Sequence, residues 1–80
     1  MPIHEIRENT RKIAILNAIH HGGKAQNGPV FGKLLAEHPE LKGRIKEISS
    51  LVNEVVQEVN KLALDEQNRI VNERWPETLT

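Results

Sequence analysis

The decapeptide HHGGKAQNGP, which spans residues 20–29, gathers the residue types of this chain that could do chemistry. It holds two of the four histidines, three of the five glycines and Lys24. A glycine-rich segment that leads into a helix can bind phosphate, because free N–H groups at the helix start and a nearby cation attract the same anion. Neighbouring histidines can also bind metal. The alternative is that the segment only connects two helices.

Neither a phosphate-loop motif nor a metal site is predicted for this segment. The pattern G-x-x-x-x-G-K-[ST] would require glycine at Ala18, a hydroxyl side chain at Ala25 and a preceding strand. Adjacent histidines point to different sides of a helix, and neither His20 nor His21 has a carboxylate three or four residues later. We therefore expect no metal and no nucleotide cofactor.

Catalytic residues are not predicted either. The chain has no cysteine, and its only serines, Ser49 and Ser50, lie inside a predicted helix. No nucleophile, base and orienting group stand at a spacing that implies a catalytic triad. We expect that these 80 residues are not an enzyme by themselves.

The charges are unevenly distributed, although the formal net charge is zero. Residues 11–46 carry seven basic and two acidic side chains, whereas residues 47–80 carry seven acidic and three basic ones. The basic part could form a face that binds phosphate, with the acidic part facing away. In the other interpretation the imbalance is accidental, and Lys24 and Lys33 are simply solvated.

A long helix is the clearest element of the sequence. Apolar residues from 41 to 62 recur at alternating spacings of four and three, which is the stripe of a packed helix. These residues are Leu41, Ile45, Ile48, Val52, Val55, Val59 and Leu62. Pro39 fits the first turn of a helix, so we predict a helix over residues 39–62. Leu51 and Val56 widen the stripe, which predicts neighbours on more than one side.

Three further helices are predicted, at residues 3–20, 29–37 and 64–74. The first should end at Gly22 and Gly23, because glycine adopts the left-handed cap conformation without penalty. Asn27 is the predicted cap of the second helix. Gly32 within that helix suggests close approach of the backbone to another helix or to a ligand, since glycine there costs about 1 kcal/mol relative to alanine.

These elements predict an all-α fold, a small bundle of three to four helices with the long helix at its centre. Residues 1–80 would form a single helical domain. No apolar run approaches the roughly 20 residues of a membrane span, and the first ten residues lack a basic segment followed by an apolar one. We therefore expect no membrane association and a cytoplasmic protein.

Residues 17–67 resemble the N-terminal appended region of archaeal-type glutamyl-tRNA synthetases. The matching features are Asn17-Ala18, Gly23-Lys24-Ala25, Val30, Gly32-Lys33 with Leu35, Pro39-Glu40-Leu41, Lys46-Glu47, the run from Leu51 to Val56, Glu58-Val59-Asn60, and Leu64 with Glu66-Gln67. In that family the region precedes a class I catalytic domain. It is similar in kind to helical modules appended to eukaryotic glutaminyl-tRNA synthetases and to the tail of a tRNA-dependent amidotransferase subunit.

The sequence departs from the family pattern in two respects. Ala63 stands where the family often has serine or threonine as the cap of the last helix, which weakens that cap by about 1 kcal/mol. The 80 residues also contain neither the H-I-G-H nor the K-M-S-K-S signature of the catalytic domain. The resemblance thus implies a non-catalytic appended domain whose full-length parent would be a glutamate–tRNA ligase.

The resemblance and the basic residues together predict an RNA-binding face. Its expected residues are Lys24, Gln26, Asn27, Lys33, Lys42, Arg44 and Lys46. The expected partners are tRNA, bound weakly by the isolated domain, and the parent catalytic domain. In the alternative, the domain is a protein-interaction module that docks on the catalytic body or on another protein of a synthetase assembly. Specificity for glutamate and its tRNA follows from the resemblance alone.

Overall fold

The computed structural model describes residues 3–79, and this part of the chain is helical with no strand. Its α-helices are α1 (Ile3–His20), α2 (Asn27–Glu37), α3 (Ile45–Asn60) and α4 (Leu64–Arg74). Two 3-10 helices complete it, η1 (Pro39–Arg44) and η2 (Pro76–Leu79). The prediction of a small all-α bundle of three to four helices is confirmed.

The end of α1 is fixed by its two glycines, as predicted. Gly22 and Gly23 have φ angles of +78° and +115°, which are the only positive values in the described part. The Gly23 N–H donates to Ala18 O at 2.6 Å and the Gly22 N–H to Ile19 O at 3.3 Å, which is the hydrogen-bond pattern of a Schellman cap. The predicted bounds of α1 and of α4 both agree with the structure.

The predicted long helix over residues 39–62 is divided in two, and that part of the prediction was wrong. Residues 39–44 form η1, and the backbone at Arg44 (φ −127°, ψ 40°) leaves helical geometry before α3 begins. The break has a packing reason. Leu41 is buried at 2% exposure, whereas Ile45 is 42% exposed. In one continuous helix these two residues would share a face, so the change of path buries Leu41 and turns Ile45 to solvent.

The start of α2 also differs from the prediction. The helix begins at Asn27, and the residue at the cap position is Gln26, whose side chain makes no capping hydrogen bond. The Asn27 side chain instead donates to Asn53 Oδ1 on α3 at 3.1 Å. Close approach of another helix to Gly32 was also expected, and this alternative was wrong, because a Cβ added there would meet no atom within 4 Å.

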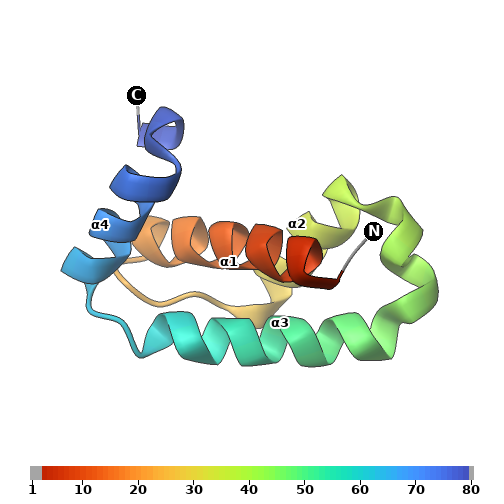
Figure 1. The fold of residues 1–80 in the computed structure, drawn as a ribbon. Helices are drawn as coiled ribbons and strands as arrows, with labels where there is room; N and C mark the ends of the chain where they lie inside the picture. The colour runs from red at the N-terminus through yellow and green to blue at the C-terminus, as the bar shows by residue number, and fades with distance from the viewer. Residues whose placement is uncertain (1–2, 80) are drawn as a thin grey trace.

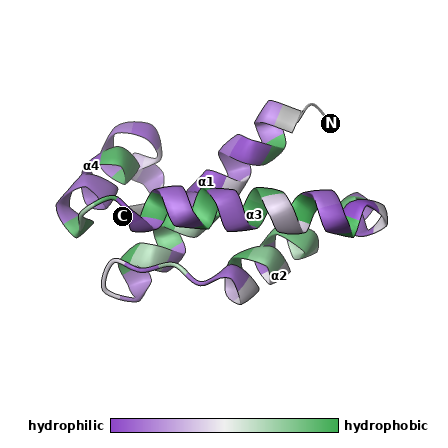
Figure 2. Cartoon of the chain, turned by 90° about the horizontal axis from the view of Figure 1, so that it is seen from below, coloured by the Kyte–Doolittle hydropathy of each residue, from purple (hydrophilic) through white to green (hydrophobic). Residues whose placement is uncertain are grey.

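The helices pack around α1, which contacts α2, α3 and α4. Figure 1 shows α1 and α3 side by side and running in the same direction, with α4 crossing near the end of α1. The helix α2 packs against both α1 and α3. Figure 2 shows that α2 is mostly hydrophobic and α4 mostly hydrophilic, so α4 offers only a narrow apolar stripe. The core is aliphatic, and Val52 and Val55 are buried in it as predicted.

Ala63 occupies the cap position of α4, with extended backbone and no capping side chain. We expect that Ala63→Ser raises the free energy of unfolding by about 0.5–1 kcal/mol, because the hydroxyl can accept a free N–H of the first turn. This corresponds to a rise in melting temperature of roughly 2–8 °C for a domain of this size. A serine placed at exposed Ala36 inside α2 is the control, and it should lower the melting temperature. Equal shifts in both variants would contradict the cap assignment.

Candidate functional site

The loop between α1 and α2 is held in place by side chains from distant parts of the chain. The Asn60 side chain on α3 binds both backbone groups of Ala25, accepting its N–H at 2.7 Å and donating to its carbonyl at 3.1 Å. Asn17 on α1 accepts the N–H of Gln26 at 3.1 Å. The backbone that follows Lys24 is therefore fixed.

Gln67 on α4 completes this arrangement from the protein interior. Its side chain is fully buried, and its Nε2 donates to Gly23 O at 2.9 Å, Val59 O at 3.0 Å and Leu62 O at 3.2 Å. One amide thus links the loop, the end of α3 and α4. We call Asn17, Asn60 and Gln67 the loop clamp.

The structural role of the loop clamp was missed from the sequence. All three residues are part of the resemblance to the synthetase region, but their polar side chains have no distinctive local spacing. The signal that could have identified Gln67 is its position among the inward-facing residues of α4, four residues before buried Val71. The loop is thus a rigid connector that presents the exposed Lys24 side chain.

The seven predicted RNA-binding residues lie in two groups. The first group lies on the loop and α2 and consists of Lys24, Gln26, Asn27 and Lys33. Ala25 in that loop is bound to Asn60, the last residue of α3. Lys42, Arg44 and Lys46 lie on η1 and the first turn of α3. The helix α3 has 16 residues and is about 24 Å long. Lys24 lies in the loop that is bound to the last residue of α3, whereas Lys46 lies in its first turn, so the two lysines are at opposite ends of this helix.

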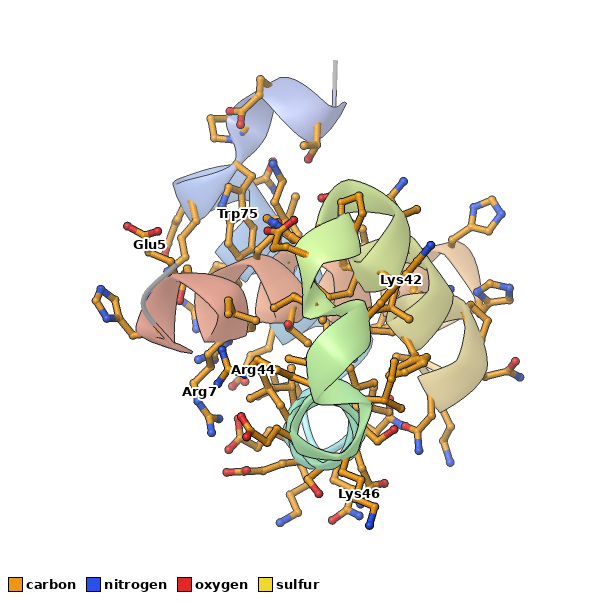
Figure 3. The ribbon with its side chains drawn as sticks, turned by 90° about the vertical axis from the view of Figure 1, so that its right-hand side faces the viewer. Glu5, Arg7, Lys42, Arg44, Lys46 and Trp75 are labelled. Atoms are coloured by element: carbon orange, nitrogen blue, oxygen red, sulfur yellow. The ribbon has the colours of Figure 1, made fainter. Side chains whose placement is uncertain are left out.

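The second group does not form one flat surface. Figure 3, which looks at this end of the molecule, shows Lys42, Arg44 and Lys46 pointing in three different directions, with Arg44 on the same side as Arg7. Arg44 is also occupied, since its guanidinium binds Glu47 at 2.6 Å and 3.0 Å. The four lysines of the predicted set form no ion pair with another residue of the described part.

A groove of about 540 Å³ runs between α1 and α2. The residues that line it on α1 are Asn9, Lys12, Ile13, Leu16, Asn17 and His20, and those on α2 are Pro29, Lys33 and Glu37. We call it the α1–α2 groove. It brings Lys33 of the predicted set together with Lys12, which the sequence-based prediction did not include. Helical spacing of the lining residues is visible in the sequence, but it does not reveal that the two faces meet.

Two further classes of site have no support within residues 3–79. No group of three or more histidine, aspartate and glutamate side chains there is arranged to hold a metal ion. No helix in the described part is both long enough and apolar enough to cross a membrane.

Comparison with known proteins identifies the relatives of this chain. A glutamate–tRNA ligase of Ignicoccus hospitalis is 52% identical over 75 residues, which are 94% of the chain and 13% of that ligase. The glutamate–tRNA ligase of Thermococcus kodakarensis is 55% identical over 73 residues, and that of Pyrobaculum aerophilum is 47% identical over 74. The chain is homologous to a short region of archaeal glutamate–tRNA ligases. The predicted resemblance is confirmed.

The glutamate–tRNA ligase match includes the loop clamp and the α1–α2 groove. Because 75 of the 80 residues are matched, no more than a few residues at the ends lie outside it. The chain spans about 13% of the length of these ligases. No protein-family model matches the chain, and no solved structure matches it.

Proposed function

We propose that residues 1–80 form the helical domain appended at the N-terminus of a glutamate–tRNA ligase, and that this domain assists tRNA binding. The observation that carries the proposal is 52% identity over 94% of the chain to a protein named for its action on tRNA. The active site and the substrate glutamate would belong to the rest of that ligase. The domain would contribute affinity, as a cytoplasmic component of protein synthesis.

The charge distribution supports contact with the phosphate backbone. Lys24, Lys33, Lys42 and Lys46 are exposed and without ionic partners in the described part, so each can release a counterion from RNA. The loop clamp holds Lys24 on fixed backbone, which reduces the ordering entropy lost on binding. The chain contains only two aromatic residues, Phe31 and Trp75, so it lacks an aromatic platform on which successive bases could stack. The dissociation constant of the isolated domain for tRNA should accordingly be about 10⁻⁴ to 10⁻⁶ M or weaker.

We expect that changing Lys24 and Lys33 together to alanine weakens tRNA binding and leaves the helical signal unchanged. Two phosphate contacts would be lost. The negative slope of the logarithm of the association constant against the logarithm of the salt concentration should therefore become shallower by roughly 1.4 to 1.8. A salt titration of tRNA binding by fluorescence anisotropy measures both quantities.

The matched control changes two cations of the acidic half, Lys61 and Arg69, to alanine. Both are exposed, and Arg69 forms an ion pair with Glu73 on its own helix at 3.4 Å. This variant should bind tRNA nearly as well as the unmodified chain. Equal affinity of the two double variants would refute the basic-face proposal.

A second candidate function is docking on the catalytic body or on another protein of a synthetase assembly. It is favoured by two large apolar side chains that are exposed in the described part of the chain, Ile45 at 42% and Leu64 at 40%. The affinity of apolar docking would be nearly independent of salt concentration, whereas the affinity of phosphate contacts falls strongly as salt is added. Ile45→Ser and Leu64→Ser should weaken association with the ligase body only if docking is the function.

A further inference from the structure

The α1–α2 groove combines cationic walls with an apolar floor. Lys12 on α1 and Lys33 on α2 line it from opposite sides, and neither forms an ion pair with another described residue. Its volume of about 540 Å³ lies within the range of small-molecule sites, which is about 300–1,000 Å³. The groove can therefore enclose part of a ligand, which scattered surface lysines cannot do.

A third donor faces the same groove. Asn17 lines it, and the Oδ1 of Asn17 accepts the N–H of Gln26, which fixes the orientation of the amide. The Nδ2 group of Asn17 has no partner in the described part and remains free to donate. Three hydrogen-bond donors from two helices thus line one concavity, as an anion requires.

The floor and the far end of the groove limit what the ligand can be. Ile13, Leu16 and Pro29 supply apolar surface, which suits the flat face of a ring. Glu37 lies at one end, where it accepts a hydrogen bond from Asn9 at 3.2 Å. A carboxylate at that end repels a second anion, so the groove favours a ligand with one negative charge next to an apolar plane.

We propose that the α1–α2 groove binds one unpaired nucleotide of RNA, with its phosphate between Lys12 and Lys33 and its base on the apolar floor. This inference rests on the proposed function and names the part of tRNA that the domain contacts. A nucleotide in a single-stranded loop carries both required features, because its base can leave the stack while its phosphate stays on the backbone. An acidic peptide offers the anion without the flat ring. Bases in a duplex are stacked and paired, so a helical stem would be bound only through phosphate.

The test uses the 80-residue chain labelled with ¹⁵N and titrated with hexauridylate. Amide shifts should be largest for the residues of the α1–α2 groove. An abasic phosphodiester of the same length and a short RNA duplex should each bind at least three times more weakly. Lys12→Ala should weaken hexauridylate binding roughly three- to tenfold, because one phosphate contact is lost. Lys61→Ala, which removes one exposed lysine that does not line the groove, should bind as the unmodified chain does.

The outcomes separate this inference from the proposed function. If tRNA binds with a strong salt dependence but hexauridylate shifts lie outside the groove, the groove assignment is wrong and the tRNA-binding proposal stands. Equal binding of the abasic oligomer overturns the placement of the base. If a deca-glutamate peptide shifts the same residues with equal or higher affinity, the groove is a protein-docking site and the inference fails. If tRNA itself does not bind, the proposed function fails first.

Discussion

Replacing Val52 with aspartate is expected to unfold the chain. Val52 is 1% exposed and lies in the aliphatic core on α3. Among the residues that the structure describes, no basic side chain is buried, so the carboxylate would be an unpaired buried charge, which costs several kcal/mol. The lost apolar burial adds about 2 kcal/mol. A domain of 80 residues has a free energy of unfolding of about 4–12 kcal/mol, so most of the stability disappears.

The measurement is a thermal melt followed by circular dichroism at 222 nm. The variant should show little helical signal at 25 °C and no cooperative transition. Ser50→Asp is the matched control, because it adds the same charge to an exposed position of the same helix. It should melt within a few degrees of the unmodified chain, since surface substitutions usually change stability by less than about 0.5 kcal/mol. A cooperative, native-like melt of Val52→Asp would contradict the assigned core.

Replacing Gln67 with glutamate should be nearly as damaging, although the two side chains have the same shape. The Nε2 group donates to three backbone carbonyls, and an oxygen in its place would face the same carbonyls as an acceptor. The Oε1 of Gln67 is itself buried and has no hydrogen-bond partner among the described residues, so a carboxylate there would have no donor on either oxygen. We expect a loss of at least about 3 kcal/mol, because a buried charge is left unpaired and carbonyls lose their donor.

A second variant separates the hydrogen bonds from the charge. Gln67→Met keeps the length of the side chain and removes its donors, and it should cost about 1–3 kcal/mol. Hydrogen exchange at the amide of Ala25 should then accelerate, because the loop loses its link to α4 through Gly23. Gln57→Glu on the exposed face of α3 is the control and should leave both stability and exchange unchanged. Unchanged exchange in Gln67→Met would mean that Gln67 does not position the loop.

The sequence alone determined the features that depend on neighbours a few residues apart. The bounds of α1 and α4 follow from helical periodicity, from the glycine pair after His20 and from Pro76, all of which act within about one helical turn. The all-α class and the burial of Val52 and Val55 follow from the same period. The related protein family was identified through the resemblance to the ligase region, because no local pattern of residues indicates it.

Only the tertiary structure decided how the candidate site is built. The break at Arg44 depends on which of Leu41 and Ile45 finds space in the core, so periodicity could not predict it. The loop clamp joins residues that are far apart in the sequence. Asn60 binds Ala25, which is 35 positions away, and Gln67 binds Gly23, which is 44 positions away. The α1–α2 groove likewise depends on which faces of two helices meet. These contacts are set by packing across the whole chain, so they cannot be predicted from the spacing of side chains within one helix.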